Sequence, residues 1–426
     1  MRARQEMFMS GLTRTVAIVL AGLLITAGSA GISSKALPSS APEEVGLSSE
    51  RLARMNKAIH EYVDAGRTPG VVTLIARHGK VVHVDAYGKA DLATGRPTRS
   101  DDIFRMYSMT KPITSVALLM LFEEGKFQLP DPLSRYFPAV ADMKVYAGST
   151  SQGGILLDSP KRQITIQDVF RHSAGFSYGF GSTPVDKAYA DADLFATDLT
   201  GLMEKLGKLP LLYQPGERWV YSVAHDVQAA LVEKLSGQKF DDFVRQRIFR
   251  PLEMNDSMFK IPADKKSRVP ALYTMQKGTL VVDTSPMGSN YGDQVFGGTS
   301  IATTIADYAL FAQMLLNKGQ LNGVRLLSPK TVELMSTNHL TPAALAAGGV
   351  GPGTGYGLGV SVLMSPAERG NIGSAGEFGW SGAASTHVLI DPKEDLVAIY
   401  CTQLIGGDFP IRANFATLLY QSIVGS

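Results

Sequence analysis

The sequence predicts an α/β protein of the α+β type, with an antiparallel sheet flanked by helices and a mostly helical insert. Strand-forming runs gather near both ends of the chain, at Val71–Arg77 and Val81–Tyr87 and again at Val388–Asp391 and Leu396–Cys401. Helical periodicity dominates the residues between these two groups. Because each pair of runs reads as a hairpin, the two ends are expected to build one sheet against which the helices pack.

Composition and charge suit a large globular core and exclude several functions. The chain has 426 residues, of which 45% are hydrophobic and 19% charged, which is enough for one large domain or two. The formal net charge is +2 without a basic cluster, so no nucleic-acid partner is expected. The single cysteine, Cys401, lies in an apolar run and reads as a small buried hydrophobe that forms no disulfide within the chain.

Residues 1–30 read as a signal peptide, followed by a linker over residues 31–44. Arginines precede an uncharged apolar stretch, Val16–Ala27, and the small residues Gly28-Ser29-Ala30 supply a cleavage site. An uncleaved anchor is the alternative, although the stretch is short for a membrane span. We therefore expect export to the bacterial periplasm or the medium, with no stable membrane span after signal cleavage.

Capping signals and periodicity predict the remaining elements in chain order. Ser48 or Ser49 caps a first helix that ends near Gly66, and a capping box at Thr165–Asp168 precedes a short helix that ends near His172. His78-Gly79 turns the first hairpin and Pro392–Asp395 the second. Further helices are expected at Ser108–Gly125, Leu194–Lys208, Val223–Leu235, Thr304–Leu316 and Ala413–Val424. This order predicts an α/β domain from residues 45–130 and 285–426 and a mostly helical domain from residues 131–284.

Ser108 begins the most informative tetrapeptide, Ser108-Met109-Thr110-Lys111. Lys111 follows one helical turn later on the same face, and an amine beside a hydroxyl favours the proton loss that a serine nucleophile requires. Pro112 is tolerated near a helix start, so Ser108 lies at or beside a helix N-terminus, where free N–H groups can hold an oxyanion. The same spacing recurs at Ser236 and Ser257, but both tetrapeptides read as surface turns.

Two later segments complete a candidate site. A Pro-Gly turn precedes a short aromatic β run that is expected to deliver Tyr221 just before a helix. A tyrosine is a usable base only beside a cation that favours its anionic form, and Lys111 can be that cation. The segment Phe378–Ala383 joins aromatic and small residues, so its backbone can approach a ligand closely. The Ala383 N–H can therefore pair with the Ser108 N–H as an oxyanion hole.

The order Ser-x-x-Lys, Tyr-Ser-x and then aromatic-Ser-Gly resembles the serine β-lactamase-like superfamily. The resemblance is nearest to class C β-lactamases and to the family VIII carboxylesterases that share their fold. It covers nearly all of the chain after the signal peptide. It implies a serine hydrolase in which Ser108 is the nucleophile and Lys111 and Tyr221 share the proton, with Tyr221 accepting it from Ser108. No cofactor and no metal are implied.

Two residues depart from the β-lactamase pattern. Val223 stands where the second motif usually has Asn, and Trp380 stands where the third motif usually opens with Lys. These changes remove an amide and a cation that contact a β-lactam, and they substitute apolar surface. Trp380, Ser381, Gly382 and Val223 are therefore expected to contact an uncharged small-molecule ester. The resemblance thus favours hydrolysis of short-chain carboxylic esters over β-lactam hydrolysis.

Other activities stay open or are disfavoured by context. A class C-like β-lactamase or D-alanyl-D-alanine peptidase is the nearest rival, and a catalytically silent penicillin-binding-like module is a second. Gly175–Gly179 fits the Gly-x-Ser-x-Gly elbow of lipases, but a helix rather than a strand precedes Ser177. No His-Glu-x-x-His motif occurs, and His172 and His225 are expected to be structural, so no zinc is expected. The sequence carries no signal for an oligomeric state.

Overall fold

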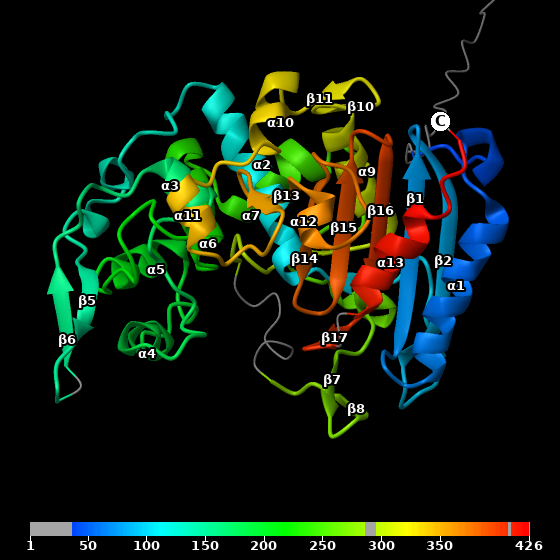
Figure 1. The fold of residues 1–426 in the computed structure, drawn as a ribbon, viewed down its shortest axis with the longest axis horizontal. Coiled ribbons are helices and arrows are strands. Elements are labelled where there is room, and N and C mark those ends of the chain that lie inside the picture. The colour runs from blue at the N-terminus through cyan, green and yellow to red at the C-terminus, as the bar shows by residue number, and fades with distance from the viewer. Residues whose placement is uncertain (1–35, 153, 286–294, 408–409, 426) are drawn as a thin grey trace, which may run out of the picture. The chain divides into compact units, whose positions relative to one another are not determined.

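The computed structural model describes residues 36–152, 154–285, 295–407 and 410–425, and the expected signal peptide lies outside them. An eight-stranded antiparallel sheet, in the order β12-β13-β14-β15-β16-β1-β2-β3, organises the chain (Figure 1). Its strands are β1 (Gly70–Arg77), β2 (Lys80–Asp91), β3 (Arg96–Pro97), β12 (Thr354–Tyr356), β13 (Ser361–Leu363), β14 (Phe378–Gly382), β15 (Thr386–Asp391) and β16 (Leu396–Cys401). Because β1 pairs with β16, the expected sheet built from both ends of the chain is confirmed.

Helices cover both faces of this sheet. On one face α1 (Ser49–Asp64), capped by Ser48, packs beside α13 (Pro410–Tyr420), which crosses in front of β16 and β1 in Figure 1. On the other face lies α9 (Ile305–Leu316), which contacts β1, β15 and β16. Alternate residues of β1 accordingly enter two separate apolar cores, Val72 and Leu74 in one and Val71 in the other. All eight residues of β1 are buried, as expected for an inner strand that has helices on both faces.

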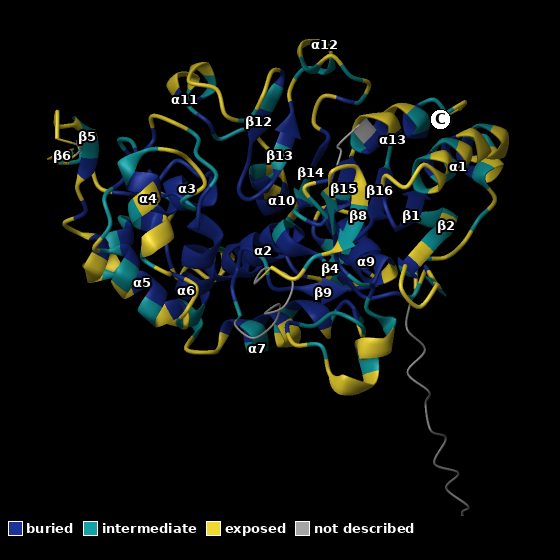
Figure 2. Ribbon diagram, turned by 90° about the horizontal axis from the view of Figure 1, so that it is seen from below, coloured by how far each residue is buried: buried dark blue, intermediate teal, exposed yellow. Residues whose placement is uncertain are grey.

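The helix α2 (Thr110–Glu123) is buried between the sheet side of the molecule and the helices of the insert (Figure 2). It packs against α6 (Ala224–Ser236), which in turn contacts α3 (Ile166–Phe170), α5 (Leu199–Leu206) and α7 (Phe240–Val244). The α3 helix starts at the expected capping box of Thr165 and Asp168. The division into two domains stays a prediction.

Shorter elements complete the described chain. The helices are α4 (Pro184–Asp191), α10 (Pro329–Met335), α11 (Pro342–Ala346) and α12 (Pro366–Arg369), and the strands are β4 (Phe104–Arg105), β5 (Val145–Ser149), β6 (Ile155–Asp158), β7 (Tyr273–Gln276), β8 (Thr279–Val282), β9 (Ala302–Thr303), β10 (Gln320–Leu321), β11 (Val324–Arg325) and β17 (Leu404–Ile405). The hairpins β5–β6 and β7–β8 lie in the insert, where the sequence predicted mostly helix.

Two predicted boundaries and one predicted strand are wrong. The helix expected from Leu194 begins only at Leu199, because Asp198 accepts the Gly201 N–H as an N-cap. The last helix ends at Tyr420, and Val424 instead donates its N–H to the Gly46 carbonyl. The aromatic segment before Tyr221 was expected to be a strand, yet it pairs with no other strand.

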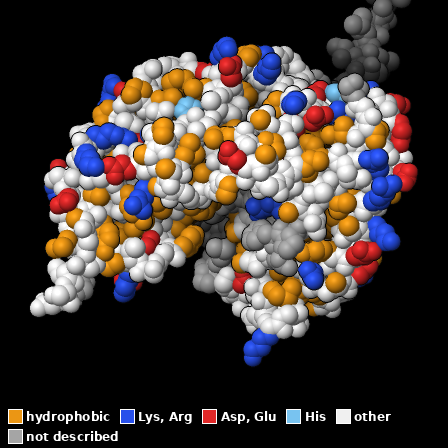
Figure 3. Space-filling model, in the orientation of Figure 1, with side chains coloured by type: hydrophobic (Ala, Val, Ile, Leu, Met, Phe, Trp, Pro, Cys, Tyr) orange, Lys and Arg blue, Asp and Glu red, His pale blue; other side chains and the backbone are white. Residues whose placement is uncertain are grey.

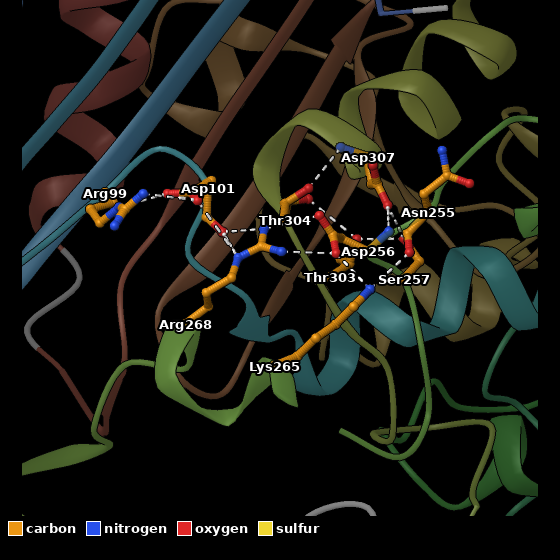
Figure 4. A network of polar contacts seen from close by, with 10 residues as sticks. All are labelled: Arg99, Asp101, Asn255, Asp256, Ser257, Lys265, Arg268, Thr303, Thr304 and Asp307. Atoms are coloured by element: carbon orange, nitrogen blue, oxygen red, sulfur yellow. Dashed lines mark hydrogen bonds and ion pairs between the residues drawn. The ribbon is translucent and has the colours of Figure 1, made fainter. Parts of the chain in front are cut away.

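A polar network joins three distant segments on the side of β4 and β9 (Figure 4). Arg268 binds the Asp256 carboxylate and the Asp101 carbonyl, and Lys265 also contacts Asp256. Ser257, which begins the third Ser-x-x-Lys tetrapeptide, donates to the largely buried Asp307 carboxylate at 3.0 Å. Burial raises the pKa of Asp307 to about 6. Ser257 is therefore part of a structural network and is not a candidate nucleophile.

Candidate active site

Ser108 lies where β4 gives way to the buried helix α2. The chain turns through one 3₁₀ turn at Tyr107–Met109 and continues directly into α2 at Thr110. Tyr107 is fully buried and has a φ of 45°, a left-handed conformation that is strained for a non-glycine residue. Such strain persists where the surrounding structure enforces it. The expected position of Ser108 beside a helix N-terminus is confirmed.

Lys111 is fully buried and reaches back to Ser108 across the first turn of α2. Its Nζ donates to the Ser108 Oγ at 3.0 Å and to the Gly298 carbonyl at 2.9 Å. The same Nζ lies 4.7 Å from the ring centroid of Tyr221 and 5.5 Å from that of Tyr178. A buried ammonium group is costly unless it is paired. Here one carbonyl, one hydroxyl and two aromatic rings surround it.

Tyr221 approaches Ser108 from the insert. Its hydroxyl lies 2.6 Å from the Ser108 Oγ, so a proton can pass between the two oxygens without a further group. The Tyr221 ring also packs against Trp380 at 5.8 Å and Tyr178 at 5.3 Å. The structure therefore brings the three predicted catalytic side chains together, with Lys111 and Tyr221 both in contact with the Ser108 Oγ. A hydroxyl contacted by both an amine and a phenol is arranged for nucleophilic attack.

Asp226 is a functional candidate that the sequence analysis missed. It is fully buried on α6, and its Oδ1 accepts the Gly298 N–H at 2.9 Å. Because the Gly298 carbonyl binds Lys111, one residue links the buried carboxyl to the buried amine. Burial raises the pKa of Asp226 to about 6, although the positive charge of Lys111 opposes that rise. Its only sequence signal is an acidic residue on an apolar helix shortly after Tyr221.

The turn after β14 lies directly against the backbone that leads to Ser108. A Cβ on Gly382 would come within 2.2 Å of the Met106 carbonyl oxygen, so this approach requires glycine. The Thr386 hydroxyl donates to the same carbonyl at 3.3 Å. Ala383 follows Gly382, and both residues line the same cavity as Ser108. The two-part N–H pocket expected from Ser108 and Ala383 stays a prediction.

A cavity of about 890 Å³ opens onto Ser108. Its lining includes Ser108, Tyr221, Trp380, Ser381, Gly382 and Ala383, together with Val350, Leu363, Val388, Leu389, Arg369, Glu377 and Arg412. Trp380 packs edge-on to Tyr356 at 5.2 Å, and the Ser381 Oγ lies 2.8 Å from the His387 Nδ1. The lining also carries charge, because Arg369 pairs with Glu377 at 3.1 Å.

Val223 differs from the other predicted substrate contacts. It is fully buried in the main core at the start of α6, and the cavity lining does not include it. The structure brings Trp380, Ser381 and Gly382 to the cavity and buries Val223 in the core. Ser177, in the lipase-like pentapeptide, donates to Asp186 at 2.6 Å and is buried away from any described histidine partner.

Other kinds of site find no support in the described part of the chain. Within residues 36–152, 154–285, 295–407 and 410–425, no group of three or more potential ligands could hold a metal ion. No helix among those residues is long and apolar enough to span a membrane. On the face drawn in Figure 3, Lys and Arg side chains are scattered rather than gathered in one patch.

Comparison with known proteins identifies the family and the fold. A family model described as beta-lactamase matches residues 55–421. An uncharacterized protein of Mycobacterium tuberculosis is 34% identical over 363 residues, covering 81% of this chain and 88% of the relative. Lovastatin esterase of Penicillium rubens is 30% identical, covering 86% and 96%. The solved structure of EstCE1, a hydrolase with promiscuous acyltransferase activity, matches with a TM-score of 0.74 at 21% identity, covering 88% and 99%.

Proposed function

The chain belongs to the beta-lactamase family, and from that premise we propose that it is a serine carboxylesterase. It is a hydrolase of the β-lactamase fold, and the expected relationship to this superfamily is confirmed. The proposal is that it cleaves short-chain, uncharged carboxylic esters through an acyl-enzyme on Ser108. One observation carries it: the Lys111 Nζ and the Tyr221 hydroxyl both lie within hydrogen-bonding distance of the Ser108 Oγ.

In the proposed reaction the Ser108 Oγ attacks the ester carbonyl carbon while its proton passes to Tyr221, whose anionic form Lys111 stabilises. The carbonyl oxygen becomes an oxyanion held by the N–H groups of Ser108 and Ala383. Collapse breaks the bond to the alcohol, which leaves with the proton held by Tyr221. Water then attacks the acyl carbonyl carbon while its proton passes to Tyr221. The bond to the Ser108 Oγ breaks as Tyr221 returns that proton to Oγ, which releases the acid and restores both residues. The 2.6 Å separation of the two hydroxyls supports these transfers.

Trp380 is the main argument for esters over β-lactams. It lines the cavity next to Tyr221 and puts an indole at the motif position that usually holds a lysine in the β-lactamases that the chain resembles. Burying a neutral polar group without a partner costs about 2–7 kcal/mol, and burying an imperfectly paired carboxylate costs more because it is charged. An uncharged ester has no such cost and gains apolar contact with the indole. Lovastatin esterase, a relative, is named for action on an ester, which supports the same substrate class.

A substrate panel tests the proposal against its rivals. Purified protein is assayed with p-nitrophenyl esters of increasing chain length, with cephalosporins and with D-Ala-D-Ala peptides, beside Ser108→Ala. Hydrolysis of the butyrate that is lost in Ser108→Ala supports the esterase. Higher kcat/KM for a cephalosporin or a peptide would assign the chain to a β-lactamase or peptidase. Turnover of none of the three classes would favour a catalytically silent binding module.

Export to the periplasm or medium is a second, separate proposal. It rests on the arginines, apolar stretch and small residues within residues 1–30. Expression of the full chain in a bacterial host should give a mature protein that starts close after Ala30 in the periplasmic fraction or medium. N-terminal sequencing of an uncleaved chain in the membrane fraction would support an anchor instead.

A further inference from the structure

We propose that His172 is a positioning residue that holds the Tyr221 hydroxyl against Ser108. The inference deepens the proposed function and rests on it. His172 binds the chain on both sides of Tyr221: its carbonyl accepts the Val220 N–H at 2.9 Å and its Nδ1 accepts the Ser222 N–H at 3.2 Å. One residue thus fixes the backbone immediately before and immediately after the tyrosine.

These two hydrogen bonds hold the Tyr221 segment in the way that pairing with a neighbouring strand would. The segment that carries Tyr221 pairs with no strand, so no ladder sets its position. It is docked instead along the chain after α3, where the Gly216 N–H donates to the Ser173 carbonyl at 2.7 Å. Ser173 binds the chain at Gly216, whereas His172 binds the two residues next to Tyr221. A misplacement of about 1 Å in such a support can cost about 10²-fold in rate.

The His172 ring also packs against the Tyr221 ring. The centroids are 5.0 Å apart at an interplanar angle of 46°, and the imidazole is almost fully buried. His225, Tyr356 and Trp219 surround the same imidazole at 4.8, 5.4 and 5.8 Å. The ring therefore has a fixed position from which it contacts Tyr221, in addition to the two hydrogen bonds.

His172 acts through Tyr221 and not as a base. Its Nδ1 accepts the Ser222 N–H and also lies 3.2 Å from the Ser222 Oγ, so that nitrogen carries no proton. Burial lowers the pKa of His172 well below its usual value, and the positive charge of Lys111 lowers it further. A neutral imidazole with Nδ1 as the acceptor is the form that this contact requires.

The backbone of His172 has a conformation that few residue types adopt readily. Its φ is 54°, a left-handed conformation that is unfavourable for most residues and is enriched in Gly, Asn, Asp and His. This conformation, just after α3 ends at Phe170, turns both the carbonyl and the ring toward the Tyr221 segment. Asn can adopt the same φ and offer its Oδ1 as the acceptor. Gly can adopt the φ but offers no acceptor and no ring.

This difference defines the test. His172→Gly, His172→Asn and wild type are compared by the rate of Ser108 labelling with a fluorophosphonate and by kcat and KM for p-nitrophenyl butyrate. His78 is a matched control, because it is an exposed histidine with a φ of 52° in the β1–β2 turn. Circular dichroism and thermal unfolding establish that each variant is folded under the assay conditions.

We expect His172→Gly to lower the labelling rate and kcat by about 10²-fold with KM changed less than about 3-fold, as for a misplaced catalytic group. His172→Asn should recover at least about 10-fold of that loss, and His78→Gly should match wild type. A folded His172→Gly variant that is labelled at the wild-type rate would overturn the role given to His172 but not the proposed function. A His172→Asn variant that is labelled as slowly as His172→Gly would do the same. A wild type in which Ser108 is not labelled would refute the proposed function as well.

Discussion

Lys111 and Tyr221 should behave as one unit because both contact the same oxygen atom. The Lys111 Nζ lies 3.0 Å and the Tyr221 hydroxyl 2.6 Å from the Ser108 Oγ, and the Nζ lies 4.7 Å from the Tyr221 ring. The informative perturbations are Lys111→Met, which keeps an apolar chain in the buried site, and Tyr221→Phe, which keeps the ring. Each removes one polar group from a three-membered arrangement.

The expected magnitude follows from these contacts. Loss of a general base lowers kcat by about 10²–10⁴-fold, which corresponds to about 2.7–5.4 kcal/mol of activation free energy. If Lys111 serves only to stabilise the anionic form of Tyr221, removing it after Tyr221 has lost its hydroxyl changes little more. The double variant should therefore lie within about 10-fold of the slower single variant, instead of multiplying the two losses.

The assay is single-turnover and steady-state hydrolysis of p-nitrophenyl butyrate by wild type, both single variants and the double variant. Lys111→Met leaves the buried Gly298 carbonyl without its donor, so the free energy of unfolding should fall by about 1–3 kcal/mol, and assays must be run well below Tm. Tyr178→Phe is the control, because its ring lies at a similar distance from Lys111 while no described residue bonds its hydroxyl. Fully multiplicative losses in the double variant would refute the reasoning.

Three further outcomes are expected. Trp380→Lys should raise kcat/KM for a cephalosporin relative to p-nitrophenyl butyrate, and a shift the other way would contradict the role given to the indole. Gly382→Ala should lower kcat by about 10²-fold or more, because its Cβ would meet the Met106 carbonyl oxygen at 2.2 Å; an unchanged kcat would place the oxyanion elsewhere. Burial raises the pKa of the Asp307 carboxyl to about 6, so the folded state binds the carboxyl proton more tightly than the unfolded state does. The stabilisation of the folded state that results is present near pH 4 and is lost as the pH rises through 6. Relative to wild type, Asp307→Asn should gain up to about 3 kcal/mol in the free energy of unfolding between pH 4 and pH 6.5, measured with urea; an identical pH dependence would show that Asp307 is not buried as described.

Local patterns were enough to predict the frame of the site. Strand-forming runs with clear turns lie at both ends of the chain, and β1 and β16 pair as expected. The Ser108 segment was found because a Ser-Lys spacing, a nearby proline and an apolar helix are all short-range signals. Trp380 was recognised by its position in a short motif, and it lines the cavity.

Long-range contacts explain what the sequence did not reveal. Asp226 and His172 act through atoms that come from segments far away in the chain, and no periodicity marks those contacts. The segment before Tyr221 has the aromatic composition of a strand, but tertiary docking on the chain after α3 determines its conformation instead. Val223 was assigned by motif position alone, and its orientation into the core could be seen only once α6 was placed.

Covalent labelling is the most direct test of the central claim that Ser108 carries the acyl group. Wild-type protein is treated with a fluorophosphonate, digested and mapped by mass spectrometry, with Ser108→Ala as the control. The account predicts a single adduct on the peptide that contains Ser108, formed in parallel with loss of esterase activity and absent from Ser108→Ala. An adduct on Ser177, or inactivation without modification of Ser108, would contradict both the site and the mechanism proposed for it.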